Sequence, residues 1–143
     1  AHLTSDDLVS LWQGEDNSVT GLATHIDEIL PNDADYIRTV FHPSNAVYAG
    51  KFTPLVDPSM DTAFTVRFRY GKDQSGGESI DLTLELRQGY VNPGTPGTLI
   101  ATLASLTDIP AGWNDGAYTL SEAEAATISD FTDLHLITVG NAP

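Results

Sequence analysis

Two segments in the middle of the 143-residue chain alternate apolar and polar residues with a period of two. In residues 63–70 the even-numbered positions are aromatic or aliphatic, and threonine and arginine stand between them. In residues 80–88 isoleucine and leucine alternate with charged or polar residues in the same way. Successive side chains of a strand point to opposite faces of a sheet, so this pattern predicts half-buried strands. We expect the two strands to form an antiparallel hairpin with a shared core, joined by the polar loop 71–79.

Weaker strand patterns flank this pair and are separated by turns rich in Pro, Gly, Asn and Asp. They lie at Asp35–Val40, Asn45–Phe52, Thr98–Leu106, Ala117–Leu120 and Leu134–Val139. Several short strands without long helical patterns predict an all-β fold, an antiparallel β-sandwich of jelly-roll-like type. The longest turn-rich loops, Asn92–Gly97 and Pro110–Gly116, are expected at the ends of the sandwich.

One short helix is predicted before the last strand. Ser121 is a good N-cap residue, and Glu124 stands three positions later, which is the spacing of a capping box. The alanines that follow favour helix. Leu120 and Ile128 are placed to close the two ends of this helix against a sheet.

The first 15 residues differ from the rest and are interpreted as an N-terminal arm, followed by a sandwich domain over residues 16–143. Leu8, Leu11 and Trp12 would lie together on one face of a short amphipathic helix. The arm could fold back onto its own sandwich or dock onto a neighbouring subunit. In the second case, these three residues are the candidate partner-binding residues.

Charge and composition exclude some classes of partner. The 20 acidic residues outnumber the 6 lysines and arginines, which gives a formal net charge of −14. Such a charge repels nucleic acid and anionic lipid, so neither is an expected partner. The sequence has no apolar run of the roughly 20 residues that a membrane helix needs, and no signal-peptide pattern at its start. The chain has no cysteine, so packing and not disulfides must stabilise the fold.

Motifs for catalysis or metal binding are missing from the sequence. No nucleophile elbow occurs, and the glycines at 76 and 77 are not followed by a phosphate-binding helix start. The histidines at positions 2, 25, 42 and 135 lack zinc-site spacing. The aspartates at 33 and 35, or at 57 and 61, could offer oxygen ligands but lack a calcium-loop pattern. We therefore expect no enzyme activity, no catalytic residues, no metal and no cofactor.

Two further groups of side chains allow simple structural interpretations. Glu85 is expected to face solvent and to pair across strands with Arg67 or Arg69, rather than to act in a glycosidase pair. Tyr90, Trp113 and Tyr118 lie in or beside loops. They could form an aromatic platform for sugars or close the ends of the core.

Several short motifs follow one another in an order that resembles a family of small tailed-phage virion proteins. They are Ile26-Asp27-Glu28, Asp33-Ala34-Asp35-Tyr36-Ile37, Asp57-Pro58, Val66-Arg67-Phe68-Arg69, Leu86-Arg87-Gln88-Gly89 and the stretch 119–134. The resemblance spans about residues 20–139. It implies a β-sandwich or jelly-roll module displayed on a virion, and its motifs are structural rather than catalytic.

The function implied by this resemblance is that of a capsid decoration, or cement, protein. Such a protein would be assembled in the host cytoplasm, would lie on the outer capsid surface, and would bind the major capsid protein and neighbouring copies of itself as a homo-oligomer. Two alternatives remain open. One is a carbohydrate-binding sandwich on a head fibre or tail that contacts host glycans, and the other is a structural subunit of the tail or neck.

Overall fold

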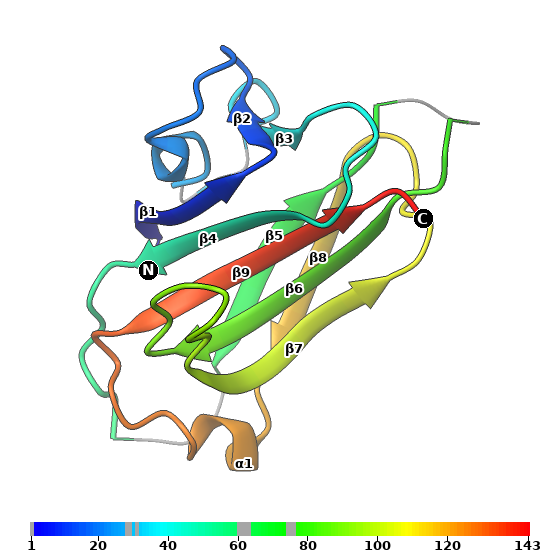
Figure 1. Ribbon diagram of the computed structural model, residues 1–143. Helices are drawn as coiled ribbons and strands as arrows, with labels where there is room; N and C mark the ends of the chain where they lie inside the picture. The colour runs from blue at the N-terminus through cyan, green and yellow to red at the C-terminus, as the bar shows by residue number, and fades with distance from the viewer. Residues whose placement is uncertain (1, 28–29, 31, 60–63, 74–76) are drawn as a thin grey trace.

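The structure is a computed structural model that describes residues 2–27, 30, 32–59, 64–73 and 77–143 (Figure 1). The main sheet has five strands in the order β1-β4-β9-β6-β7, and every neighbouring pair is antiparallel. These strands are β1 (Leu3–Ser10), β4 (Ala46–Phe52), β6 (Asp81–Gln88), β7 (Thr98–Leu106) and β9 (Leu134–Asn141). The fold is therefore the all-β antiparallel sandwich that the sequence predicts, while its jelly-roll form stays a prediction.

Two small antiparallel sheets face the main sheet. One pairs β5 (Thr65–Tyr70) with β8 (Asn114–Thr119), and it lies behind the main sheet in Figure 1. The other pairs β2 (Trp12–Gly14) with β3 (Ile37–Thr39), and it lies beside the 3₁₀-helix η1 (Leu22–His25) near β1. The only α-helix in the described part of the chain, α1 (Glu122–Ala125), precedes the final strand.

The predicted positions of the strands agree with the structure, but the predicted hairpin is wrong. Strand β5 pairs with β8 from Thr65↔Thr119 to Tyr70↔Asn114, whereas β6 pairs with β7 and β9. The connection 71–79 therefore joins one layer to the other and does not form a hairpin. Its residues 74–76 lie outside the described part. Alternation fixes which face of a strand is apolar but not which strand lies beside it, so the sequence pattern could not select the partner.

The shared core predicted for β5 and β6 is confirmed. Leu84 and Leu86 of β6 belong to the largest buried cluster. Val66 and Phe68 of β5 pack against it from the other layer, together with residues around α1. The predicted capping box is also present, because the Ser121 hydroxyl accepts from the Glu124 N–H while the Glu124 carboxylate accepts from the Ser121 N–H. Leu120 and Ile128 are buried on either side of the helix, as predicted.

The N-terminal segment does not form the predicted helix or a separate arm. Residues 3–10 form the edge strand β1, and Leu11 turns the chain with a positive φ of 62° before β2 begins at Trp12. The Trp12 side chain is buried among Leu3, Leu22 and Tyr48 in a second core cluster. Three apolar residues at this spacing fit either a helix or a strand, and the backbone hydrogen bonds available along β4 favour the strand.

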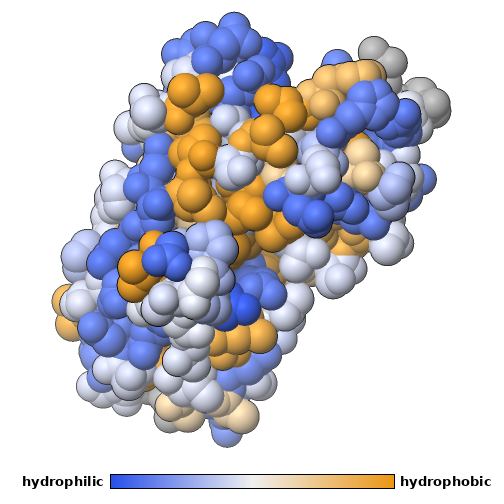
Figure 2. All heavy atoms as spheres, in the orientation of Figure 1, coloured by the Kyte–Doolittle hydropathy of each residue, from blue (hydrophilic) through white to orange (hydrophobic). Residues whose placement is uncertain are grey.

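The outer face of the main sheet also carries apolar residues. Ala49 of β4 and Ile137 of β9 are buried there beneath Tyr90, and Leu8, Val47 and Val139 pack around them partly exposed. Apolar surface is visible over this region in Figure 2. In the described part of the chain, no helix is long and apolar enough to cross a membrane.

The register of β6 gives a first prediction. Leu84 points into the largest core cluster with 5% of its surface exposed, whereas Thr83 points to the opposite face of the sheet. Leu84→Ala should lower the free energy of unfolding by about 2–5 kcal/mol, the usual range for emptying a buried leucine site. Thr83→Ala should cost far less. Urea denaturation of both variants tests this, and equal losses would contradict the register.

A second prediction concerns the first strands. Deleting residues 1–14 removes β1, the edge strand that pairs with β4, together with the buried side chain of Trp12. The truncated chain should lose its cooperative thermal transition, or melt at a far lower temperature, because Tyr48 and Leu22 would become exposed to water. Circular dichroism during heating measures this. An unchanged transition would show that residues 1–14 do not contribute to the core.

Candidate functional site

An exposed cluster of aromatic and charged residues lies where the two small sheets meet. We call Tyr36, Arg69, Trp113, Asp33 and Asp115 the tryptophan cluster. Arg69 and Asp115 are cross-strand partners on β5 and β8, and Trp113 directly precedes β8. Asp33 and Tyr36 come from the segment just before β3. The cluster therefore joins residues from both small sheets.

Arg69 is the centre of this cluster. Its Nε and Nη2 donate to the two carboxylate oxygens of Asp33 at 2.7 and 3.0 Å, and Nη1 donates to Asp115 at 2.8 Å. The hydrogen bonds with Asp33 and then Asp115 raise the pKa of the Arg69 guanidinium above its usual value. Two-pronged contacts of this kind fix the plane of the guanidinium as well as its position.

The Trp113 ring is held between Arg69 and Tyr36. The Arg69 guanidinium carbon lies 5.8 Å from the centre of the Trp113 ring. The Tyr36 ring meets Trp113 edge-on, with centroids 5.5 Å apart and planes at 65°. Trp113 nevertheless keeps 42% of its surface exposed. Together with Ile26 and Phe68, the cluster lines a surface hollow of about 430 Å³.

This arrangement suits binding to a protein surface. Trp, Tyr and Arg are the residue types that most often dominate protein interfaces. Because neighbouring side chains already hold Trp113, little side-chain freedom would be lost when a partner covers it. A flat stacking platform for a sugar is less suited to this site, because Arg69 lies over the indole and the Tyr36 ring is steeply inclined to it.

The residues predicted to bind a partner are placed differently by the structure. Trp12 has 9% of its surface exposed and lies in the core, while Leu11 is 45% exposed and Leu8 packs on the outer face of the main sheet. The three aromatic residues of the possible sugar platform do not come together either. Tyr90 is buried beside His135, and the Tyr118 hydroxyl donates to Glu124 at 2.8 Å.

The predicted partners of Glu85 are also wrong. Glu85 accepts a hydrogen bond from Arg87 on its own strand at 2.7 Å, because β5, which carries Arg67 and Arg69, lies in the other layer. The tryptophan cluster was missed for the same reason. The only signal in the sequence was that Trp113 lies in a long turn-rich loop.

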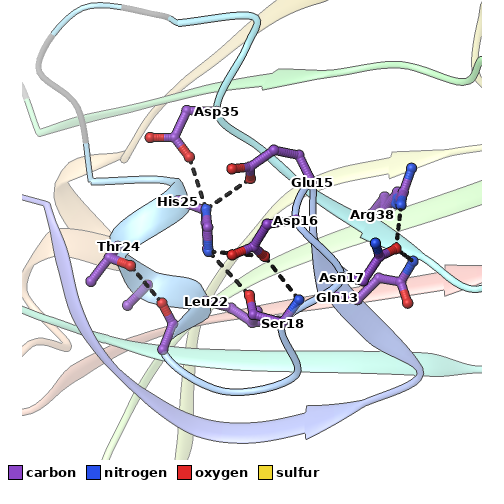
Figure 3. A network of polar contacts seen from close by, with 12 residues as sticks. Gln13, Glu15, Asp16, Asn17, Ser18, Leu22, Thr24, His25, Asp35 and Arg38 are labelled. Atoms are coloured by element: carbon purple, nitrogen blue, oxygen red, sulfur yellow. Dashed lines mark hydrogen bonds and ion pairs between the residues drawn. The ribbon is translucent and has the colours of Figure 1, made fainter.

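A second polar cluster lies close to the first and is centred on His25 (Figure 3). Its Nδ1 is 2.8 Å from Glu15 Oε2 and 3.0 Å from Asp35 Oδ1. On the other side of the ring, Nε2 is 3.2 Å from the Ser18 hydroxyl and 3.8 Å from Asp16 Oδ1. The histidine spacing in the sequence gave no sign of this site, because its members come from three separate segments.

The surroundings of His25 favour positive charge at the ring. Burial by itself lowers the pKa of His25, but the hydrogen bond with Asp35 and the negative charges of Glu15, Asp16 and Asp35 outweigh it. The pKa of His25 is therefore raised above its ordinary value of 6.5. A metal ion at this site would have to replace the proton on Nδ1, because both use the same nitrogen lone pair.

A tight turn directly after β2 makes room for the His25 ring. The Gly14 N–H donates to the Ser18 carbonyl, and Asn17 adopts a positive φ of 68° within this turn. A Cβ atom at position 14 would lie 2.8 Å from His25 Nε2 and 2.7 Å from the Ser18 hydroxyl. Glycine at position 14 therefore leaves the space that the imidazole ring occupies.

A third polar cluster surrounds His135 on the outer face of the main sheet. His135 Nδ1 lies 2.6 Å from Asp7 Oδ2, and Nε2 lies 2.8 Å from Asp133 Oδ1. Lys51 also donates to Asp133 at 2.8 Å. No serine, threonine or other nucleophile among the described residues hydrogen-bonds with His135, so the cluster is best explained as a tie between β1, β4 and β9.

Comparison of the chain with protein-family models, with curated proteins and with solved structures finds no match. The function is therefore inferred from the residues and the geometry described above.

The Asp133 carboxylate gives a prediction about acid stability. Hydrogen bonds from Lys51 and then His135 lower the pKa of Asp133. The stability that this ionised group contributes is present above its unfolded-state pKa of about 3.9 and is lost as the pH falls through the lower folded-state value. Asp133→Asn should therefore destabilise the protein more at pH 7 than at pH 2.5. Urea denaturation at both pH values measures the difference, and an equal loss at both would contradict the assignment.

Proposed function

We propose that the protein is a decoration protein on the outer capsid surface of a tailed bacteriophage, where it binds the major capsid protein through the tryptophan cluster. The sequence resemblance to small virion proteins supports the class of protein. The observation that carries the proposed contact is the exposed Trp113 ring, held in place by Arg69 and Tyr36. A decoration protein needs such a preformed contact, because it must bind a repeated surface with little loss of freedom.

Charge and fold are consistent with this role. With a net charge of −14, the chain would be steered toward a basic patch on a capsid subunit and would repel other decorated particles. Two core clusters lie between the layers of the sandwich and support the elements that carry the contact. Association with neighbouring copies of the chain on the capsid remains part of the proposal.

The second candidate function is carbohydrate binding on a head fibre or tail. The specific observation in its favour is the same exposed indole, since aromatic faces stack well on sugars. The inclined Tyr36 ring and the guanidinium over Trp113 favour a protein partner instead. A glycan array separates the two functions, because a decoration protein should give no signal. Imaging of labelled virions separates both from a tail or neck subunit.

Substitution of Trp113 tests the proposed contact. Trp113→Ala should lower the occupancy on undecorated capsids of the parent phage by about 30-fold at limiting protein concentration, which corresponds to the loss of about 2 kcal/mol typical of an interface hot spot. Co-sedimentation of capsids with labelled protein measures the occupancy. The melting temperature should fall only modestly, because Trp113 keeps 42% of its surface exposed although its ring contacts Arg69 and Tyr36.

Phe41→Ala is the matched control. Phe41 is an aromatic residue with 89% of its surface exposed, and it lies outside the tryptophan cluster. The Phe41→Ala variant should bind capsids with the same occupancy as the parent chain. Unchanged decoration by Trp113→Ala, or an equal loss with Phe41→Ala, would show that the tryptophan cluster is not the contact.

A further inference from the structure

We propose that Glu15, His25 and Asp35 form a binding site for a divalent transition-metal ion of the Zn²⁺ class. This inference is independent of the proposed capsid function. It rests on the convergence of three potential ligand atoms, His25 Nδ1, Glu15 Oε2 and Asp35 Oδ1, which all lie within 4.8 Å of one another. Glu15 directly follows β2, His25 ends η1, and Asp35 lies in the segment before β3.

One carboxylate oxygen of Glu15 lacks a hydrogen-bond partner, although the side chain as a whole is 30% exposed. This atom, Oε2, is buried and lies 2.8 Å from His25 Nδ1. The single N–H that Nδ1 can carry is used by Asp35 Oδ1 at 3.0 Å. A proton on Nδ1 can therefore hydrogen-bond to only one of the two carboxylates. A metal ion between the three atoms would bind both carboxylates and the nitrogen lone pair.

The spacing of the three atoms is suitable for a small metal ion. Zinc bonds to nitrogen and oxygen are about 2.0–2.2 Å long, so neighbouring ligand atoms lie roughly 3–3.5 Å apart. The distances from Nδ1 to the two carboxylate oxygens, 2.8 and 3.0 Å, are close to that range. Small side-chain movements would complete the geometry, and water would fill the remaining coordination positions.

The other side of the imidazole ring has the partners that a metal-binding histidine needs. Such a histidine usually donates its second N–H to an oxygen atom, which fixes the tautomer and aims the free nitrogen at the metal. Here Nε2 faces the Ser18 hydroxyl at 3.2 Å, with Asp16 Oδ1 beyond it at 3.8 Å. Asp16 is itself held by the Ser18 N–H at 2.8 Å. With its one proton on Nε2, the neutral ring would present the Nδ1 lone pair to the ion.

The nitrogen ligand determines which ion is expected. Calcium and magnesium prefer sites made of oxygen ligands alone, whereas zinc and its neighbours bind imidazole well. Calorimetric titration of the full chain with Zn²⁺ should therefore show one site, and the site should persist in excess Mg²⁺ and Ca²⁺. The melting temperature should rise with Zn²⁺ concentration, because the ion binds only the folded arrangement.

Substitutions that preserve side-chain shape test the ligands. Glu15→Gln and Asp35→Asn should each weaken Zn²⁺ binding by at least about tenfold, and Ser18→Ala by about tenfold through the orientation of His25. Asp108→Asn, an exposed aspartate that pairs with Lys72 on the connection between β7 and β8, is the matched control and should bind Zn²⁺ like the parent chain. Circular dichroism of the metal-free proteins shows whether each variant is folded.

A measurement on the parent chain needs no variant. Substoichiometric Co²⁺ should broaden the ring signals of His25 in histidine NMR spectra before those of His2, His42 and His135. The proposal is overturned if the parent chain does not bind Zn²⁺ as one site, if Glu15→Gln and Asp35→Asn bind like the control, or if another histidine is affected first.

Discussion

The inner face of the five-stranded sheet is mostly apolar, with Asp6 and Thr138 as polar exceptions, and the rest of the structure depends on how that face is covered. It is covered by two small sheets instead of one continuous second sheet. The β5–β8 sheet packs with α1 over β6, β7 and β9, whereas β2–β3 and η1 cover β1 and β4. A two-stranded sheet is marginally stable by itself, so each small sheet depends on the main sheet for its shape.

The division of the second layer explains where the polar clusters lie. The two small sheets are separate, so there is a boundary between the elements that cover the main sheet. Polar side chains at this boundary can pair with one another without entering the core. Arg69 of β5 reaches across this boundary to Asp33 near β3, and Trp113 beside β8 reaches Tyr36. The tryptophan cluster therefore ties the two halves of the second layer together and still exposes an aromatic ring to solvent.

The sequence predicts the strands well and their neighbours poorly, for a physical reason. The alternation of apolar and polar residues over 80–88 indicates that one face of the strand is buried, and this can be read from each strand alone. Pairing of β5 with β8, about 50 residues apart, depends on the whole fold and leaves no mark in either segment. Ser121 and Glu124 were predictable because a capping box is complete within four residues. Trp12 was misplaced because its spacing from Leu8 fits a helix as well as a strand followed by a turn.

The tryptophan cluster and the His25 cluster also form only in the folded chain, and the segment before β3 contributes to both. Successive members of the group Glu15, His25 and Asp35 are ten positions apart, unlike the close spacing of a local metal motif, so only the folded chain brings them together. Asp35 lies between Asp33 and Tyr36, which both belong to the tryptophan cluster. Any cation that holds Asp35 against His25 also restrains the backbone that presents these two residues. Ordering this segment before a partner arrives removes part of the entropy that binding would otherwise cost. The polar cluster around His25 thus orders the segment from which Asp33 and Tyr36 reach the tryptophan cluster, and Asp35 itself also lines the hollow beside Trp113.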